Sequence, residues 1–328
     1  MKRLMIYGAT GYTGRMVAEL AAASGLSPLL AGRDASKLAA LADRLQVEHR
    51  VFALDSLDSI ADALADVSVI LNCAGPFQRT ARRLMEAAIR CGAHYLDVSA
   101  ELDSYRLAEA LDDQAIQAGS MLLPGSGGSV AMLGCLVGHA IGLVPTPVRL
   151  RLALQVRGAM SRGSVISATE NLSTQCLMRV DGQLVGRAPN ELQPFDFGRG
   201  LVDCIPVTLP DLVTVWRSTG IPWIETFVHM GGSNFPQGDL SALADGPSAE
   251  ERAANRYRAI AEVTDGDGNV RHALLDTVNG YTFTSMAAVE AARRVLEGET
   301  RPGFQTPAGL FGKGFATSIA DTRIIRIC

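Results

Sequence analysis

The residues best suited to chemistry are seven near the start of the chain that read GATGYTG, in a GxxGxxG spacing. They follow the apolar run Leu4–Tyr7 and precede a helical pattern. The glycines permit a tight turn, a close approach to a pyrophosphate and close packing of helix on strand, while the helix start offers N–H groups to the anion. A glycine-rich turn without a ligand is the alternative. The predicted dinucleotide contacts in this stretch are Gly8, Thr10, Gly11, Tyr12, Thr13 and Gly14.

A second candidate lies where the next apolar run ends, at Arg33 and Asp34. NAD-binding chains usually offer a carboxylate here to the ribose 2′-hydroxyl, whereas a guanidinium can pair with a 2′-phosphate. Ser36 and Lys37 add a hydroxyl and a positive charge. The pattern therefore favours NADP(H), although Asp34 keeps NAD(H) open. The alternative for Arg33 is a solvated loop cation.

Other candidates follow the ends of the next predicted strands, because parallel sheets bind ligands at the carboxyl ends of their strands. Asp55 is placed to reach the adenine amino group or to cap a helix with Ser56. Glu101 puts a carboxylate near the nicotinamide edge, or else complements a helix dipole. The residues from Cys73 onward are mostly small, so this backbone can pass along the ribose and nicotinamide. The alternative is a loop that contacts no ligand. The predicted cofactor contacts from these loops are Asp55, Cys73, Ala74, Gly75, Pro76, Phe77 and Ser99.

The second half of the chain contributes SRGS at residues 161–164, just before the helical pattern 165–172. Its hydroxyls, N–H groups and arginine can converge on an anionic or carbonyl oxygen, and a serine helix cap with a surface arginine is the alternative. No tyrosine is followed four residues later by a lysine, so the proton-donating pair of short-chain dehydrogenases is absent. We therefore nominate Glu101, Ser164 and His229 as catalytic candidates.

Strand-length apolar runs alternate with helix-period segments through the first third of the chain. This alternation predicts a parallel, doubly wound α/β sheet of the Rossmann type. Strands are expected at residues 4–7, 28–31, 51–53, 67–72, 94–98 and 121–123, and helices at 15–23, 36–44, 56–64, 81–91 and 102–118.

The alternation ends at the glycine-rich run 124–128, which we take as a nicotinamide-side loop, a hinge or a domain linker. The chain then predicts an NADP-binding domain at 1–128 and an α+β domain with a largely antiparallel sheet at 129–328. The segment 281–312 is expected to pack back on the first domain. Further elements expected are a helix at 130–141, a strand at 148–156, hairpins at 176–186 and 257–278, and a helix at 281–296.

Composition narrows the class of partner. With 328 residues, 48% hydrophobic and 20% charged, the chain has ample core for one or two domains. A net charge of −4 gives no field for nucleic acid or anionic membrane. The six cysteines show no CxxC or Cys/His pairing, so neither a metal site nor a disulfide framework is expected. A cytoplasmic protein without a signal peptide or transmembrane segment is expected, because the longest apolar stretch, 130–144, is short and broken.

Several motifs in order resemble one known group: GATGYTG, AGRDASKL, LNCAGPF, GAHYLDVSAE, LPG, SRGS, RSTGIP, AVEAARRVLEGE and GFQTPAGLFGKGF. The chain resembles the saccharopine dehydrogenase-like oxidoreductases, which include the bacterial trans-acting enoyl reductases. The resemblance implies an NADP-binding Rossmann domain, a second domain that shapes the substrate pocket and often dimerises, and hydride transfer at a C=C or C=N bond. Two departures lie on the nicotinamide side: Ala100-Glu101 replaces GE, and Gly128-Ser129 replaces an aromatic-Asp pair.

The expected function is an NADP(H)-dependent oxidoreductase, acting as a homodimer on an activated double bond in a small or lipid-like substrate. Two alternatives remain. One is a regulatory protein that senses NAD(P) without turning it over. The other is an imine or amino-acid dehydrogenase, which predicts arginines converging on a substrate carboxylate.

Overall fold

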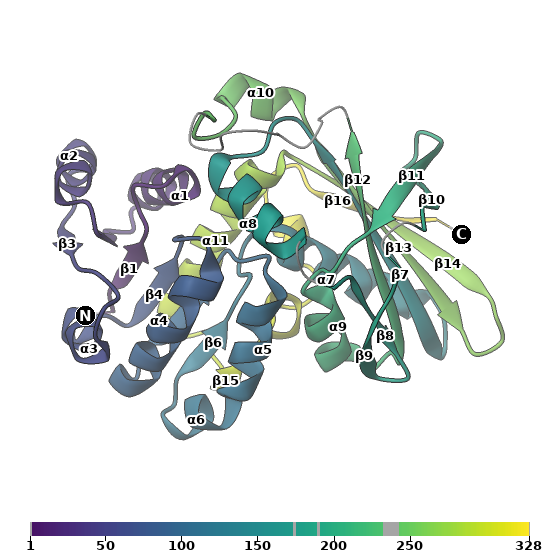
Figure 1. The fold of residues 1–328 in the computed structure, drawn as a ribbon, viewed down its shortest axis with the longest axis horizontal. Helices are drawn as coiled ribbons and strands as arrows, with labels where there is room; N and C mark the ends of the chain where they lie inside the picture. The colour runs from purple at the N-terminus through teal and green to yellow at the C-terminus, as the bar shows by residue number, and fades with distance from the viewer. Residues whose placement is uncertain (1, 173–174, 189–190, 232–242, 328) are drawn as a thin grey trace. The chain divides into compact units, whose positions relative to one another are not determined.

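The computed structural model describes residues 2–172, 175–188, 191–231 and 243–327. The chain forms two compact units, each built from two separated parts of the sequence. The first comprises residues 1–128 and 284–310, and the second comprises 129–283 and 311–328 (Figure 1). Helix α11 (Gly280–Glu297) begins in the second unit and continues in the first.

The first unit is built on a seven-stranded sheet in the order β15-β6-β5-β4-β1-β2-β3. Every strand pair in it is parallel, which confirms the predicted Rossmann-type sheet. The order reverses between β1 and β4, and ligands of such sheets bind beyond the strand ends at this switch point. The strands are β1 (Leu4–Tyr7), β2 (Leu29–Gly32), β3 (His49–Val51), β4 (Val69–Asn72), β5 (His94–Asp97), β6 (Met121–Leu123) and β15 (Gly303–Phe304).

The helices in the first 128 residues bury apolar side chains on one side, and the last of them buries Ala115 alone. They are α1 (Tyr12–Ala23), α2 (Ala35–Leu45), α3 (Leu57–Leu64), α4 (Phe77–Cys91), α5 (Leu102–Ala110) and α6 (Asp112–Gln117). The single helix predicted at 102–118 is wrong, because the chain turns at Leu111, where ψ is 3°. Asp112 begins the second helix and accepts a hydrogen bond from the Phe304 N–H at 2.7 Å. A contact with a distant strand therefore fixes the break.

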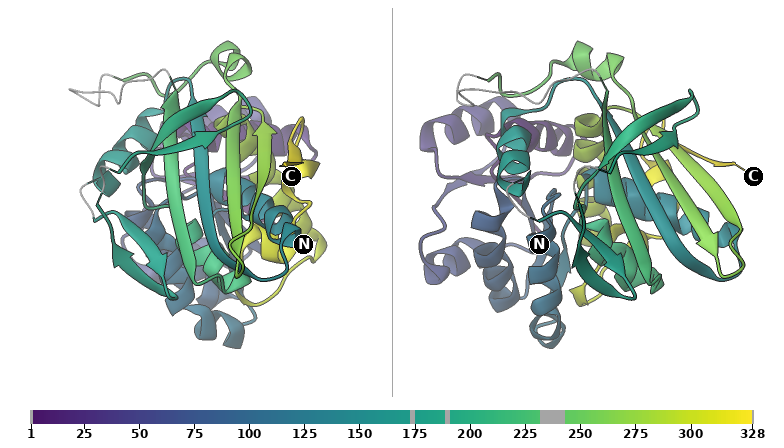
Figure 2. Two further views of the ribbon diagram at one scale, coloured as in Figure 1. Left: turned by 90° about the vertical axis from the view of Figure 1, so that its right-hand side faces the viewer. Right: turned by 45° about the vertical axis from the view of Figure 1, so that its right-hand side comes forward.

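The second unit contains a nine-stranded sheet with the main order β10-β11-β12-β7-β13-β14-β16, and β8 and β9 attached beside β12. Only β7 and β12 pair in parallel among its described strands, so the sheet is mixed and mostly antiparallel. Its long strands can be followed in Figure 2. The strands are β7 (Pro147–Arg157), β8 (Leu177–Val180), β9 (Gln183–Gly186), β10 (Gln193–Asp196), β11 (Leu201–Pro206), β12 (Trp223–Gly231), β13 (Tyr257–Asp265), β14 (Val270–Thr277) and β16 (Arg323–Ile327).

The predicted hairpins at 176–186 and 257–278 are confirmed as β8–β9 and β13–β14. Asp181 and Gly182 have φ values of 47° and 76°, the left-handed pair that a two-residue hairpin turn requires. No helix in the described part of the chain is long and apolar enough to cross a membrane. The remaining helices are α7 (Gly128–Ala140), α8 (Arg162–Leu172), α9 (Asp211–Thr219), α10 (Ala249–Ala254) and α12 (Pro307–Phe311).

Candidate functional site

The turn between β1 and α1 folds tightly on itself. Gly8 has a φ of 79°, and its N–H donates to the Ala31 carbonyl at 2.8 Å. The Gly11 N–H donates back to the Gly8 carbonyl at 3.1 Å. A Cβ on Gly14 would lie 2.1 Å from that same carbonyl oxygen, closer than any real contact. Glycine is therefore required at position 14 for the helix to approach the strand.

The N-terminus of α1 has no side-chain cap. Its N-cap, Gly11, provides no side-chain hydrogen bond, and its first turn holds no acidic residue. The first N–H groups of a helix have no acceptor within the helix. By contrast, Asp34 caps α2 and the carboxylate of Glu101 covers the start of α4. Carboxylates thus cap the starts of α2 and α4, whereas the N-cap of α1 makes no such side-chain bond.

Arg33, after β2, is exposed and makes no hydrogen bond or ion pair with any residue that the structure describes. The carboxylate of Asp34 is occupied: it accepts from the Lys37 N–H at 3.1 Å and the Ser36 hydroxyl at 2.8 Å, and lies 3.3 Å from the Lys37 ammonium. The Lys37 N–H, with the Ser36 hydroxyl, lowers the pKa of Asp34. The acidic residue that kept NAD(H) open is therefore engaged with α2.

The loop after β4 lies against the glycine turn. A Cβ built on Gly8 would come within 2.8 Å of Ala74. The structure therefore brings together two stretches that the sequence nominated separately, residues 8–14 and 73–77. Burial raises the pKa of the Cys73 thiol far above its usual value, so this cysteine stays protonated. Asp55, after β3, is exposed, and Ser56 makes no side-chain cap bond to α3.

Glu101 is 6% exposed, and its two carboxylate oxygens accept from the N–H groups of Phe77 and Gln78 at 3.1 and 2.9 Å. The side chain therefore joins the loop after β5 to the start of α4. Ser99 is also buried, and its N–H donates to Asp97 at 3.0 Å. Its hydroxyl has no partner within the described structure. Contact of Ser99 with a cofactor and proton handling by Glu101 stay predictions.

In the second unit, Ser161 caps α8 by accepting a hydrogen bond from the Ser164 N–H at 3.1 Å. The Tyr281 hydroxyl accepts from the Ser161 N–H at 2.7 Å and donates to the Ser164 hydroxyl at 2.9 Å. Arg162 pairs with Asp245 at 2.5 Å. The helix-cap alternative for SRGS is thus observed, and catalysis by Ser164 stays a prediction. Sequence reasoning missed Tyr281, whose only signal is a phenol at the start of a predicted helix.

His229 lies on β12, and its Nδ1 is 2.9 Å from the Asp203 carbonyl oxygen. A carbonyl only accepts, so this nitrogen carries the proton, and Nε2 is left as an acceptor in the neutral ring. Ser164 and His229 have separate hydrogen-bond partners. Glu101 belongs to the other unit.

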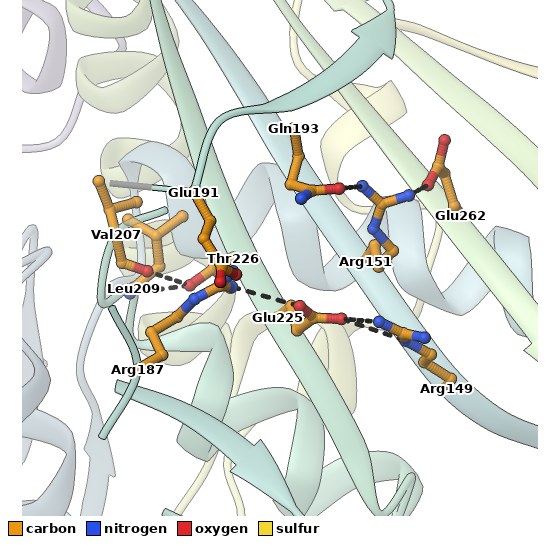
Figure 3. A network of polar contacts seen from close by, with 10 residues as sticks. All are labelled: Arg149, Arg151, Arg187, Glu191, Gln193, Val207, Leu209, Glu225, Thr226 and Glu262. Atoms are coloured by element: carbon orange, nitrogen blue, oxygen red, sulfur yellow. Dashed lines mark hydrogen bonds and ion pairs between the residues drawn. The ribbon is translucent and has the colours of Figure 1, made fainter. Parts of the chain in front are cut away.

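Three arginines converge on one face of the second sheet (Figure 3). Arg149 and Arg187 both bind Glu225, at 2.6 and 3.3 Å, and the side chains of Arg187 and Glu225 are only 7% and 8% exposed. Arg151 binds Glu262 at 2.7 Å. All three guanidinium groups also lie over aromatic rings. Each guanidinium binds a glutamate, with Arg149 and Arg187 sharing Glu225, so this cluster has the contacts of a structural ion-pair network rather than of a site set for a substrate carboxylate.

One carboxyl group of the second unit is buried without a hydrogen-bond partner among the described residues. Asp211, at the start of α9, is fully buried, and neither of its oxygens has a hydrogen-bond partner within the described residues. Burial raises the pKa of Asp211 to about 8. An unpaired charge in such a place is costly, so the group is held mainly protonated at neutral pH.

A comparison of the sequence with known protein families points to the same kind of domain as the glycine turn, the start of α1 and the strand order. Residues 4–123 match the saccharopine dehydrogenase NADP binding domain. This part of the chain is therefore similar to that family. The match spans the first six strands of the parallel sheet, and a domain of this family implies an NAD(P) cofactor.

The curated relatives share only part of this chain. A lipid droplet localized protein from Caenorhabditis elegans is 30% identical over 111 residues, which cover 30% of this chain and 26% of the relative. A trans-acting enoyl reductase from Mycobacterium leprae is 34% identical over 106 residues, covering 30% and 25%. Each match thus spans about a quarter of the relative's length.

One solved structure is similar over its whole length. It is a saccharopine dehydrogenase (L-Glu forming) from Saccharomyces cerevisiae, with a TM-score of 0.67, 12% sequence identity and 100% coverage of both chains. At this identity the similarity establishes the fold, including the order of a parallel sheet followed by a mixed one.

Proposed function

We propose that the protein is an NADP(H)-dependent oxidoreductase. The observation that carries the proposal is the pair Arg33 and Asp34: among the described residues the guanidinium makes no hydrogen bond or ion pair, while the carboxylate is engaged with α2. A free guanidinium beside the β2 end suits a 2′-phosphate, and an engaged carboxylate does not suit a ribose 2′-hydroxyl. The start of α1, which has no side-chain cap, suits the pyrophosphate.

NADPH supplies a hydride when it is bound. The acceptor that we propose is an activated C=C or C=N bond in a small or lipid-like molecule, supported by the motif order and by the name of the mycobacterial relative. In this proposal the Ser164 hydroxyl stabilises the negative charge that develops on the substrate as the hydride arrives. Glu101 or His229 transfers the proton that the reduction also requires. The arginine network argues against an amino-acid dehydrogenase, because its three guanidinium groups already bind glutamates of the protein.

Cofactor choice is tested by titrating the protein with NADPH and with NADH, in the wild type and in Arg33→Ala. Loss of a charge-assisted contact to the 2′-phosphate should weaken NADPH binding roughly 10- to 100-fold and leave NADH binding unchanged. Arg44→Ala is the matched control, because Arg44 lies on α2 and, among the described residues, pairs with Glu19 alone at the surface. Unchanged NADPH affinity in Arg33→Ala would remove the argument.

The reaction class is tested by following NADPH oxidation with enones, imines and keto acids. Turnover of an enone or imine, abolished by Ser164→Ala, is the expected result. No turnover across the panel, together with tight NADPH binding, would favour a protein that senses the cofactor. We also propose a cytoplasmic homodimer, which light scattering of the purified chain and fractionation of cells would check.

A further inference from the structure

Three fully buried polar side chains lie in a row where β4 and β5 end: Asn72, Tyr95 and Asp97. The Asn72 amide donates to the Tyr95 hydroxyl at 3.2 Å, and that hydroxyl donates to the Asp97 carboxylate at 2.8 Å. The two strands are neighbours in the sheet, and Asn72 is in register with Asp97. Polar groups at such depth are costly unless all are satisfied, and these are bonded from one end of the row to the other.

At one end, Asn72 fixes the loop after β4. Its side-chain oxygen accepts from the Ala74 N–H at 2.9 Å, and its amide also donates to the Thr80 hydroxyl at 3.0 Å. Thr80 in turn donates to the Ala74 carbonyl at 2.7 Å. Both sides of Ala74 are thus held, and Ala74 is the residue packed against Gly8.

At the other end, Asp97 fixes two further loops. One of its carboxylate oxygens accepts from the N–H groups of Ser99, after β5, and Gly125, after β6, at 3.0 and 2.7 Å. Its backbone carbonyl accepts from both the N–H and the hydroxyl of Ser126 at 2.8 Å. One residue therefore joins the loops of two strands to the end of β5.

We propose that Asn72, Tyr95 and Asp97 form a positioning network that holds the loops after β4, β5 and β6 for the nicotinamide half of the dinucleotide. The inference rests on the proposed binding of NADP(H). In sheets of this order, the adenosine half lies over the strands on the β1–β2–β3 side of the switch point and the nicotinamide half over those on the β4–β5–β6 side. The three side chains of the network lie on β4 and β5, on the second side, whereas Arg33 follows β2, on the first.

This division gives a test with two probes, NADPH and 2′,5′-ADP, which carries only the adenosine half and the 2′-phosphate. Tyr95→Phe removes the hydroxyl that bridges Asn72 and Asp97 and keeps the ring. We expect it to weaken NADPH binding roughly tenfold and to change 2′,5′-ADP binding less than twofold. Thr80→Val, at the partly exposed end, should give the same pattern with a smaller loss of stability.

Ser120→Ala is the control, because it deletes a buried hydroxyl just before β6, at the end of the strand opposite the loop that Asp97 holds. It should leave binding of both probes unchanged. If Tyr95→Phe and Thr80→Val weaken both probes equally, or neither, the network has no selective role and the inference is wrong. If the wild type binds neither probe, the proposed function fails first, and that outcome is separate from a wild type that binds both.

Discussion

The glycine turn offers a pair of substitutions that separates folding from ligand binding. In Gly14→Ala the new methyl would lie 2.1 Å from the Gly8 oxygen, 2.9 Å from its carbonyl carbon and 3.0 Å from the Ala9 Cα. An ordinary contact begins near 3.4 Å, so the backbone must move by about 1.3 Å. All three atoms are backbone and cannot rotate away. We expect the variant to lose roughly 3 kcal/mol of unfolding free energy, at the upper end of the cost of overpacking.

Gly11→Ala is the matched variant in the same turn. Its methyl would meet only the Gly8 oxygen, at an ordinary 3.4 Å, and Gly11 has an extended backbone with φ −71° that any residue adopts. The free energy of unfolding should change by less than about 0.5 kcal/mol. A methyl at this N-cap nevertheless takes the place where a pyrophosphate approaches the backbone. NADPH affinity should therefore fall at least tenfold.

Urea denaturation and NADPH titration of both variants are the assays. The expected result is a loss of stability and binding in Gly14→Ala, and a loss of binding alone in Gly11→Ala. If Gly11→Ala binds NADPH as the wild type does, the phosphate does not approach this turn. If Gly14→Ala is as stable as the wild type, the close packing of α1 on β1 does not contribute to the free energy of unfolding.

Three further substitutions test other features. Glu101→Ala should lower the free energy of unfolding by roughly 2 kcal/mol in urea, because two N–H groups at the start of α4 lose a buried carboxylate; an unchanged midpoint would contradict this. Asp211 has a pKa of 3.8 in the unfolded chain and about 8 when folded, so wild-type stability should fall as pH rises between these values. Asp211→Asn should therefore gain up to about 4 kcal/mol relative to the wild type from pH 4 to pH 7 in thermal denaturation, and parallel profiles would refute the burial argument. Glu225→Ala should cost about 3 kcal/mol because it leaves the buried Arg187 with the more distant, exposed carboxylate of Glu191 at 3.9 Å, whereas a loss below about 1 kcal/mol would mean that water replaces the carboxylate of Glu225.

Much of the first unit is readable in the sequence because its signals are local. Five of the six predicted strands share at least three residues with the observed ones, and the glycine motif is one contiguous stretch. The strand predicted at 51–53 lies instead at 49–51, because pairing with β2 places the polar His49 and Arg50 in the sheet. The elements that escaped prediction depend on distant residues. Strand β15 has two residues and exists by pairing with β6, which lies about 180 positions earlier in the chain. The turn at Leu111 likewise depends on a bond to Phe304.

The residues of the candidate site also differ in whether their roles depend on neighbours in the sequence or on distant residues. The role of Asp34 is local, since an aspartate three residues before a lysine N–H is an ordinary helix cap. The role of Glu101 is not, because it binds the N–H groups of residues 24 and 23 positions earlier. Asn72 and Asp97 gave a weak signal as polar residues that end apolar strands. Their connection through Tyr95 follows only from the register of β4 on β5.

The return of residues 284–310 to the first unit has a practical consequence for anyone who cuts the chain into fragments. Residues 1–128 expressed alone would lack β15, whose Gly303 and Gln305 N–H groups donate to the carbonyls of Ser120 and Leu122. Strand β6 would then become an apolar, unprotected sheet edge, which promotes aggregation. The first unit is thus one folding module interrupted by a large insertion. A soluble cofactor-binding fragment should be made by joining 1–128 to 284–310 through a short linker.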